Sequence, residues 1–533
     1  MPTLKIDEKE VTVPPGTTLI RAAKELGIEI PYYCWHPGLS VAGNCRMCLV
    51  EVDKMPKPQI SCHIQCQDGM VVRTQSETVK KLREHVLEFL LVNHPLDCPV
   101  CDQAGECGLQ DYYMKHGLYD SRLNENKVKK GQKAVPIGPT VMLDNERCIL
   151  CSRCVRFTDE ISKSHEFGIF NRGDHSEIGL YPGEELNNKY SGNVVDICPV
   201  GALTDRDFRF KCRVWYLKKT ESICPGCARG CNITIETSHD RPTGVENERV
   251  MRLKPRFNDE VNDWWICDSG RYGYHSIDQN RILTPLVREG TAAAKESNWK
   301  DALKQACVSF QNLMAQNKEQ IAILLSPMMT NEEIYLAHKL FVETLQLSRV
   351  LLLGVHPNGD QDDLLIRSDK HPNRMGAEWL GLIEGKEVTQ KLVSEIEKGL
   401  IQGLFLFGQD IVSQFQSERL NGALNQMRLS LFIGSNYNQT VSSARMILPG
   451  ASYAEKDGTF TNFEGRVQRI RKALFPLGES RSELEIIQSF AAQLGLDLPS
   501  QTSEDIFLEL AGSVPKFRGM TYDTIGHEGV RPA

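Results

Sequence analysis

Apolar and polar residues alternate at the start of the chain and then recur at helical spacing. Two alternating runs, 3–6 and 10–13, are separated by three polar residues and predict a β-hairpin. Apolar residues at helical spacing predict a helix over 19–26, and Gly27 is expected to end it. A helix laid on strands indicates a small α+β domain.

The pattern in the second half of the chain is different. Short apolar runs at 321–325, 350–353, 404–407 and 429–433 are expected to be strands, and they alternate with helical stretches such as 331–344. This rhythm is typical of a parallel α/β sheet. The region has no G-x-G-x-x-G, no G-x-x-x-x-G-K-[ST] and no convincing nucleophile–base pairing, so it indicates no nucleotide or catalytic site.

Two more segments are predicted between these two regions of the chain. The first is a helix over 79–92, whose apolar face is expected to hold Leu82, Val86, Phe89 and Leu90. The second is 124–139, a basic segment with glycine and proline that we interpret as a linker.

Composition narrows the class of protein. A chain of 533 residues with 41% hydrophobic residues is long enough for several packed domains. The net charge of −7 argues against a nucleic-acid-coating protein. Neither a secretory signal nor an apolar run of about 18 residues is evident, so we expect a soluble chain that reaches membranes only through partners.

The 18 cysteines are better explained by metal ligation than by disulfides, which a reducing cytosol opposes. The first block has the spacing C-x10-C-x2-C-x13-C: Cys34, Cys45, Cys48 and Cys62. Four thiolates fit a 2Fe-2S cluster, whereas zinc sites favour two C-x2-C pairs. Cys66 follows nearby and is left out of this set.

The second block has three cysteines, Cys98, Cys101 and Cys107, and His94 stands where a fourth ligand is needed for a 4Fe-4S cluster. A neutral imidazole in place of a thiolate is expected to raise the reduction potential. The alternative is that Cys66 or Cys212 closes the site. His85 and His116 are interpreted as ordinary residues.

The third block is C-x2-C-x2-C with a remote Cys-Pro, a specific 4Fe-4S spacing: Cys148, Cys151, Cys154 and Cys198. Arg147, Arg153 and Arg156 flank it and either stabilise an anionic cluster or lie on solvated faces.

The fourth block is C-x2-C-x3-C with a distal cysteine: Cys224, Cys227, Cys231 and Cys267. We expect another 4Fe-4S cluster supported by strands at 233–236, 243–246 and 250–253, with zinc as the competitor. Cys212 and Cys307 remain ordinary residues.

The order of these blocks resembles the large iron-sulfur subunit, also called the G subunit, of bacterial NADH:quinone oxidoreductase (respiratory complex I). The resemblance includes 448–468 and 514–522. It implies one 2Fe-2S and three 4Fe-4S clusters, with the fourth off the main electron path, and FMN on a partner that oxidises NADH. It also implies peripheral-arm partners, an indirect link to the membrane arm, no nucleic acid, and a place on the cytoplasmic face of the bacterial inner membrane.

The resemblance also divides the chain into five domains. A 2Fe-2S ferredoxin-like β-grasp domain at 1–76 precedes a 4Fe-4S domain with one histidine and three cysteines at 77–120. A ferredoxin-like 4Fe-4S domain follows at 140–215, and a 4Fe-4S domain of molybdopterin-oxidoreductase type at 217–275. The remainder, 276–533, resembles the α/β scaffold of molybdopterin oxidoreductases.

Active members of that last group bind molybdenum through a Cys, selenocysteine or Ser soon after an Asn-Glu-Glu helix. This chain has Asn331-Glu-Glu333, but the segment after it offers only Ser348, so we expect no molybdopterin. The leading hypothesis is an electron-relay protein that passes electrons from NADH toward quinone, without an active site of its own. The alternative is a molybdenum- or tungsten-dependent formate dehydrogenase. An iron-only hydrogenase would need more cysteines after residue 300 than Cys307.

Overall fold

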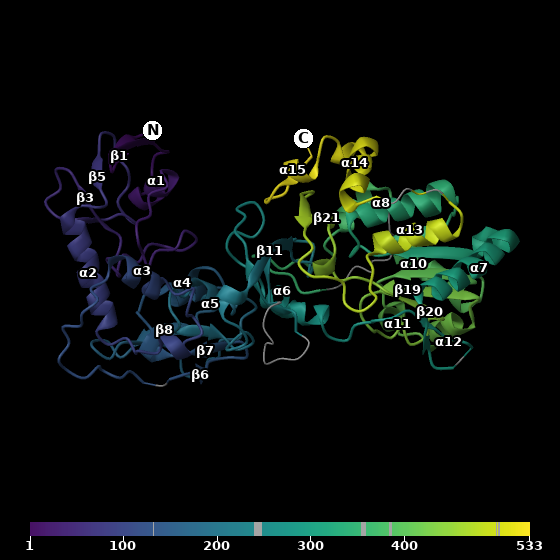
Figure 1. The fold of residues 1–533 in the computed structure, drawn as a ribbon, viewed down its shortest axis with the longest axis horizontal. Helices are drawn as coiled ribbons and strands as arrows, with labels where there is room; N and C mark the ends of the chain where they lie inside the picture. The colour runs from purple at the N-terminus through teal and green to yellow at the C-terminus, as the bar shows by residue number, and fades with distance from the viewer. Residues whose placement is uncertain are drawn as a thin grey trace. The chain divides into compact units, whose positions relative to one another are not determined.

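A computed structural model describes residues 1–131, 133–238, 248–290, 292–352, 359–382, 386–496, 498 and 501–532. The chain divides into two compact units, Met1–Leu217 and Lys218–Ala533. Figure 1 traces the elements of each unit along the chain.

The first unit begins with a five-stranded sheet of order β2-β1-β5-β3-β4. Its strands are β1 (Thr3–Ile6), β2 (Lys9–Thr12), β3 (Leu49–Val52), β4 (Gln59–Ile60) and β5 (Val71–Arg73). β1 and β2 form the predicted hairpin, and β1 runs parallel to β5. Helix α1 (Leu19–Glu25) ends before Gly27, whose φ of +72° is one that glycine adopts without strain.

Helix α2 (Glu77–Leu91) confirms the second predicted helix, and the Ser76 hydroxyl caps it by accepting from the Val79 amide. The predicted apolar face is confirmed in part: Val86 and Leu90 pack on a hydrophobic core, whereas Phe89 is 81% exposed. The most buried row of the helix is Val79, Arg83 and Leu87, spaced four residues apart. Tertiary packing has turned a row that contains an arginine toward the interior.

The remainder of the first unit is built from short elements. Its helices are η1 (Cys98–Val100), α3 (Gly108–His116), η2 (Asn145–Arg147), α4 (Arg153–Glu160), α5 (Asn193–Ile197) and η3 (Val214–Tyr216). Its strands are β6 (Val135–Pro136), β7 (Val141–Leu143), β8 (Phe167–Phe170), β9 (Glu177–Leu180) and β10 (Leu203–Asp205). They form the sheet β10-β7-β6 and the hairpin β8-β9.

The segment 124–139, interpreted as a linker, contacts the end of α2. β6 lies within it, and the Lys127 ammonium donates to the carbonyls of Leu91 and Val92 at 2.8 Å. These carbonyls end α2, where a cation is favourable. The segment therefore packs beside the loop that carries His94.

The second unit starts with an antiparallel sheet of β11 (Lys218–Ile223), β12 (Asn232–Thr237) and β13 (Val250–Pro255). β12 and β13 confirm two of the predicted strands; the third, at 243–246, lies outside the described residues. The short helices α6 (Asp268–Tyr272) and η4 (Gly273–Ile277) follow.

A seven-stranded sheet of order β15-β14-β20-β19-β18-β16-β17 forms the centre of the second unit. Its strands are β14 (Leu286–Val287), β15 (Lys295–Glu296), β16 (Ile321–Leu325), β17 (Val350–Leu352), β18 (Gly403–Phe407), β19 (Leu429–Gly434) and β20 (Met446–Pro449). The five strands from β20 to β17 are parallel, which confirms the predicted α/β sheet. Residue 353 lies outside the described residues.

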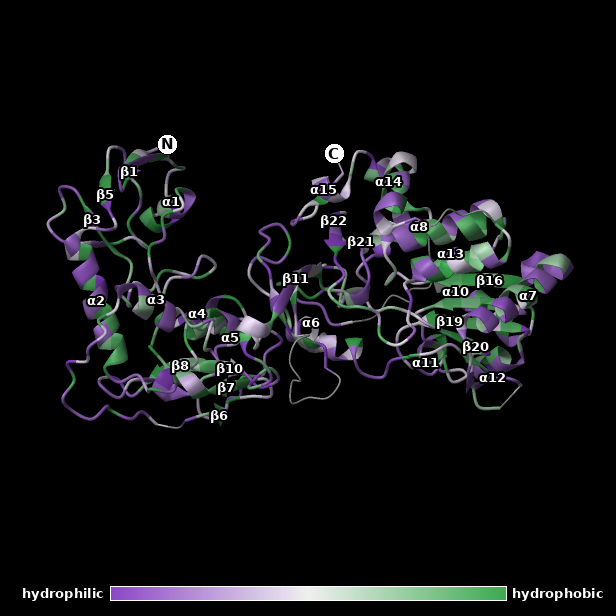
Figure 2. Ribbon diagram, viewed as in Figure 1, coloured by the Kyte–Doolittle hydropathy of each residue, from purple (hydrophilic) through white to green (hydrophobic). Residues whose placement is uncertain are grey.

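Both faces of this sheet are covered, so its five parallel strands are almost entirely apolar. Helices α7 (Trp299–Asn317), α8 (Asn331–His338), α13 (Glu483–Gln493) and α14 (Ser503–Ser513) enclose one core with Ile323 and Phe405. Helices α10 (Lys386–Glu397), α11 (Ile411–Phe415) and α12 (Glu418–Gln426) enclose the other with Leu324 and Leu404. Figure 2 shows the apolar strands between these amphipathic helices.

The remaining elements are η5 (Lys318–Gln320), η6 (Lys339–Thr344), α9 (Arg374–Trp379), η7 (Tyr453–Glu455), η8 (Pro515–Phe517), α15 (Tyr522–Ile525) and the hairpin of β21 (Gly458–Thr461) and β22 (Val467–Ile470). Among the described residues, no helix combines the length and apolar character that crossing a bilayer requires.

Candidate metal centres

The first block places its four thiols in two pairs, Cys34 with Cys45 and Cys48 with Cys62. The Cys34 amide lies 3.5 Å from the Sγ atom of Cys45. Cys48 comes just before β3 and Cys62 just after β4, so two paired strands hold the second pair. Two pairs of thiols are what two irons require.

The second block lines one cavity with all four predicted residues: His94, Cys98, Cys101 and Cys107. Burial, with the nearby cations Lys127 and Arg147, lowers the pKa of His94 to about 4. The imidazole is therefore neutral near pH 7, which is the form that binds a metal.

The third block also lines a single cavity: Cys148, Cys151, Cys154 and Cys198. Three of these ligands surround the start of α4, and Cys198 ends α5. Burial raises the pKa of both Cys148 and Cys198 to about 12. Without a metal these thiols are protonated, so metal binding must release protons.

One hydrophobic core joins the first three blocks. It contains Tyr33, Cys34, Met47, Leu87, Leu109, Cys151, Val200 and Ala202, and the partly buried cysteines packed on it are Cys45, Cys107, Cys148 and Cys198. The three blocks, which lie far apart in the sequence, therefore share one interior.

Arginines beside the third block connect it to the first. Arg156 donates to the carbonyl of Cys34 and, at 3.4 Å, to that of Cys151. Arg153 donates to the Trp35 carbonyl at 2.6 Å. Since Arg153 is buried, at 7% exposure, the interpretation of it as a solvated residue is wrong.

The third block also touches the second. The Gly108 amide, next to Cys107, donates to the Pro199 carbonyl at 2.9 Å. A Cβ atom at Gly201 would lie 2.3 Å from the Sγ atom of Cys101, so only glycine fits there. The turn after Cys198 thus packs directly against the second block, so the third block contacts both of the others.

The fourth block lies in the second unit and brings its two parts together. The Cys224 amide donates to the Cys231 carbonyl at 2.9 Å, and Cys267 caps α6. A Cβ atom at Gly270 would lie 3.0 Å from the Sγ atom of Cys224 and 3.4 Å from that of Cys267. Burial raises the pKa of Cys224 and Cys231, and that of Cys267 to about 11.

Three cysteines lie outside the four predicted sets. Cys66 is buried in the core of the N-terminal sheet, which also contains Cys48 and Cys62. The Cys212 thiol donates to the Arg213 carbonyl at 3.4 Å. Cys307 is buried in α7. Within the described residues, neither Cys66 nor Cys212 lines the His94 cavity.

In the described part of the chain, no three His, Cys, Asp or Glu side chains are arranged to hold a single metal ion.

The parallel sheet carries a cavity of about 420 Å³ at the carboxyl ends of its strands, where open α/β sheets bind ligands. Its lining includes Cys224, Gly408, Gly434, Ser452, Lys456 and Glu483. Ser348 is not among these lining residues; its hydroxyl donates to Glu319 at 2.7 Å on an exposed surface.

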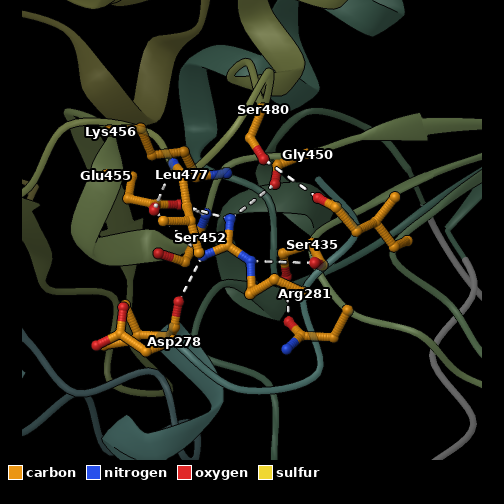
Figure 3. Close-up of polar contacts among 12 residues, drawn as sticks. Asp278, Arg281, Ser435, Gly450, Ser452, Glu455, Lys456, Leu477 and Ser480 are labelled. Carbon is orange, nitrogen blue, oxygen red and sulfur yellow. Dashed lines mark hydrogen bonds and ion pairs between the residues drawn. The ribbon is translucent and has the colours of Figure 1, made fainter. Parts of the chain in front are cut away.

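Buried charges near this cavity are neutralised by the protein itself. Figure 3 shows Arg281 directed at Glu455, with a closest ion-pair distance of 2.8 Å, and at the carbonyls of Ser435 and Gly450. Lys456 forms a second buried cluster, 2.8 Å from Glu333 and 2.6 Å from Glu483.

Family models match most of the chain. A 2Fe-2S iron-sulfur cluster binding domain matches 1–77, and the NADH-ubiquinone oxidoreductase-G iron-sulfur binding region matches 83–122. The ferredoxin-like domain of NADH-quinone oxidoreductase subunit 3 matches 138–204. The 4Fe-4S domain of NADH-ubiquinone oxidoreductase NDSU1/NuoG-like proteins matches 217–275, and molybdopterin oxidoreductase matches 366–493. The fold class predicted from the sequence is thereby confirmed.

Relatives align along nearly the whole chain. The NADH-ubiquinone oxidoreductase 78 kDa subunit, mitochondrial, of Candida albicans is 32% identical over 96% of this chain and 85% of its own length. The NADH-ubiquinone oxidoreductase 75 kDa subunit of Reclinomonas americana is 31% identical over 99% and 94%. The NADH-quinone oxidoreductase G subunit of Rickettsia conorii is 30% identical over 95% and 90%. With four cysteine blocks in the expected order and relatives of this coverage, the chain belongs to the family of the NADH-quinone oxidoreductase G subunit.

Proposed function

We propose that this chain is the electron-relay component of the peripheral arm of NADH:quinone oxidoreductase, passing electrons that originate from NADH toward quinone. The observation that carries the proposal is the shared core of the first unit, which contacts ligand candidates from three blocks. Iron-sulfur clusters exchange single electrons with little rearrangement, and closely spaced centres form a path. This chain's residues hold such centres in fixed relative positions.

The proposed ligand sets are those of the four blocks. One 2Fe-2S cluster takes Cys34, Cys45, Cys48 and Cys62. Three 4Fe-4S clusters take His94, Cys98, Cys101 and Cys107; Cys148, Cys151, Cys154 and Cys198; and Cys224, Cys227, Cys231 and Cys267. Two observations support this assignment. The members of each set lie together, and Cys212 and Cys307 have other contacts, namely the Arg213 carbonyl and the core of the second unit.

The path inside the first unit is proposed to run from the 2Fe-2S site through the third block to the His94 site. Arg156 bridges the first and third blocks, and the Gly108–Pro199 hydrogen bond joins the third to the second. The order of the blocks along the chain is therefore not the order of electron transfer.

The partners we propose are the other peripheral-arm proteins, including one that carries FMN and oxidises NADH, with the membrane arm contacted indirectly. The chain would be peripheral, on the cytoplasmic face of a bacterial inner membrane. The support is family membership together with an array of electron-transfer sites.

The test is anaerobic reconstitution followed by metal analysis. The four clusters together predict about 14 irons per chain, one 2Fe-2S signal in electron paramagnetic resonance and no molybdenum. The purified complex is expected to contain an FMN-bearing partner. Stoichiometric zinc in place of iron would refute the proposed electron-transfer function. Bound molybdenum or tungsten would support the formate dehydrogenase alternative.

A further inference from the structure

Arg83 on α2 is a buried guanidinium without a hydrogen-bond partner among the described residues. The residue is 1% exposed, and its Nε, Nη1 and Nη2 atoms all lack an acceptor. Arg281, whose side chain is also 1% exposed, donates to the carboxylate of Glu455 and to three backbone carbonyls (Figure 3). Arg83 therefore has the donors of a buried ion pair but no acceptor among the described residues.

Three groups that can carry negative charge act on Arg83: Asp7, Cys48 and Tyr112. Asp7 already accepts from the amide of Thr74, at 2.7 Å, and from its hydroxyl. Burial raises the pKa of Tyr112 to about 12, so its phenol stays neutral. Cys48 belongs to the proposed 2Fe-2S ligand set. Of these three neighbours, the Cys48 site is therefore the one that gains negative charge when a cluster binds.

The row of α2 that contains Arg83 faces the shared core. Leu87, one turn further on, packs there with Cys34 and Met47. Tyr33 in the same core is fully buried, and its hydroxyl also lacks a partner among the described residues. Arg83 and Tyr33, both near cysteines of the first block, are thus buried donors without an acceptor among the described residues, and an acceptor from outside the polypeptide would satisfy them.

A buried guanidinium without a hydrogen-bond acceptor is unfavourable, and it cannot shed its proton to escape that cost. A 2Fe-2S cluster held by four thiolates is anionic, and reduction adds one further negative charge. We propose that Arg83 is the counter-charge of the 2Fe-2S site and raises its reduction potential. The inference rests on the proposed function, because it requires that ligand set.

The proposal requires opposite effects of Arg83 in the two states of the protein. With the cluster bound, Arg83 stabilises the site and favours reduction. In the cluster-free chain the same guanidinium has no hydrogen-bond partner among the described residues and has Asp7 as its charged neighbour, so an apolar side chain of similar length is expected to be more stable there. A residue that only packs α2 would stabilise both states.

The experiment compares Arg83→Gln, Arg83→Lys and Arg83→Met in the full chain. The control is Arg73→Gln, in the same domain, where an exposed arginine pairs with Asp53 at 2.7 Å. Redox titration by electron paramagnetic resonance gives the 2Fe-2S midpoint potential. Arg83→Gln is expected to make reduction at least tenfold less favourable, about 59 mV for one electron, while Arg83→Lys and Arg73→Gln stay near the wild type. Thermal unfolding of the cluster-free chain is expected to occur at a higher temperature in Arg83→Met than in the wild type.

An unchanged potential in a cluster-containing Arg83→Gln protein would overturn the proposal. Where the Gln variant loses its cluster, the cluster-free unfolding midpoint of Arg83→Met decides: a higher midpoint supports the counter-charge, and an equal or lower one overturns it. A wild-type chain without any 2Fe-2S signal would instead refute the proposed function.

Discussion

The buried arginines Arg281, in the second unit, and Arg83, in the first, differ in their partners. Arg281 donates to Glu455, with a closest distance of 2.8 Å, and to backbone carbonyls. Arg83 has no acceptor among the described residues. A buried cation with a complete set of internal partners needs no further group. A buried cation without an acceptor is where we propose that the charge of a bound cluster acts.

The largest expected effect is on electron transfer through the first unit. Cys154→Ala removes a ligand from the middle site and should abolish NADH-to-quinone turnover in the assembled complex. Cys224→Ser should remove one cluster signal from the electron paramagnetic resonance spectrum and leave turnover intact, because the family resemblance places that site off the path. Turnover that survives the first change, or fails in a fully assembled second variant, would contradict this comparison.

The next effect is on the stability of the second unit. Arg281→Met leaves Glu455 with one fewer cation in a buried site and should lower the free energy of unfolding by about 3–5 kcal/mol, with or without iron. Chemical denaturation measures it. The control is Arg531→Met, whose arginine pairs with Glu464 on an exposed surface and should change stability by at most about 1 kcal/mol. Equal effects of the two variants would show that burial of the pair does not matter.

A pH-dependent effect in the second unit should be slightly smaller. Burial raises the pKa of Glu332 from 4.5 to about 7, so the folded state favours the protonated acid. Its contribution to stability is present below pH 4.5 and is lost as pH rises to about 7. The stability of Glu332→Gln relative to the wild type should therefore rise over that range by on the order of 3 kcal/mol. Parallel denaturation profiles at both ends of the range would contradict the shift.

The smallest expected effect is a change of potential at the His94 site. His94→Cys replaces a neutral ligand by a thiolate and should keep a 4Fe-4S cluster while lowering its potential. Redox titration of that signal is the measurement. An unchanged potential would mean that His94 does not bind the iron.

Local pattern predicted much of the fold because short-range chemistry decides it. α1 ends at a glycine that takes a left-handed φ, and the strands from β16 to β19 are apolar runs buried on both faces. The interior face of α2 could not be predicted in this way. Hydrophobic periodicity favoured Phe89, which is exposed, and treated Arg83 as polar, although it is buried. Hydrophobic periodicity predicts that charged side chains face water. A charged cofactor beside a buried side chain would make that prediction fail.

The sequence by itself determined the four ligand blocks and the family, because cluster ligands follow cysteine spacing and spacing is written along the chain. Only the tertiary structure decided that the third block contacts both the first and the second, and that Arg83 is buried without a hydrogen-bond partner among the described residues. The physical reason is how far apart along the chain the interacting residues lie. Ligand loops are local, whereas the electrostatics of a relay arise from residues that packing brings together from distant parts of the chain.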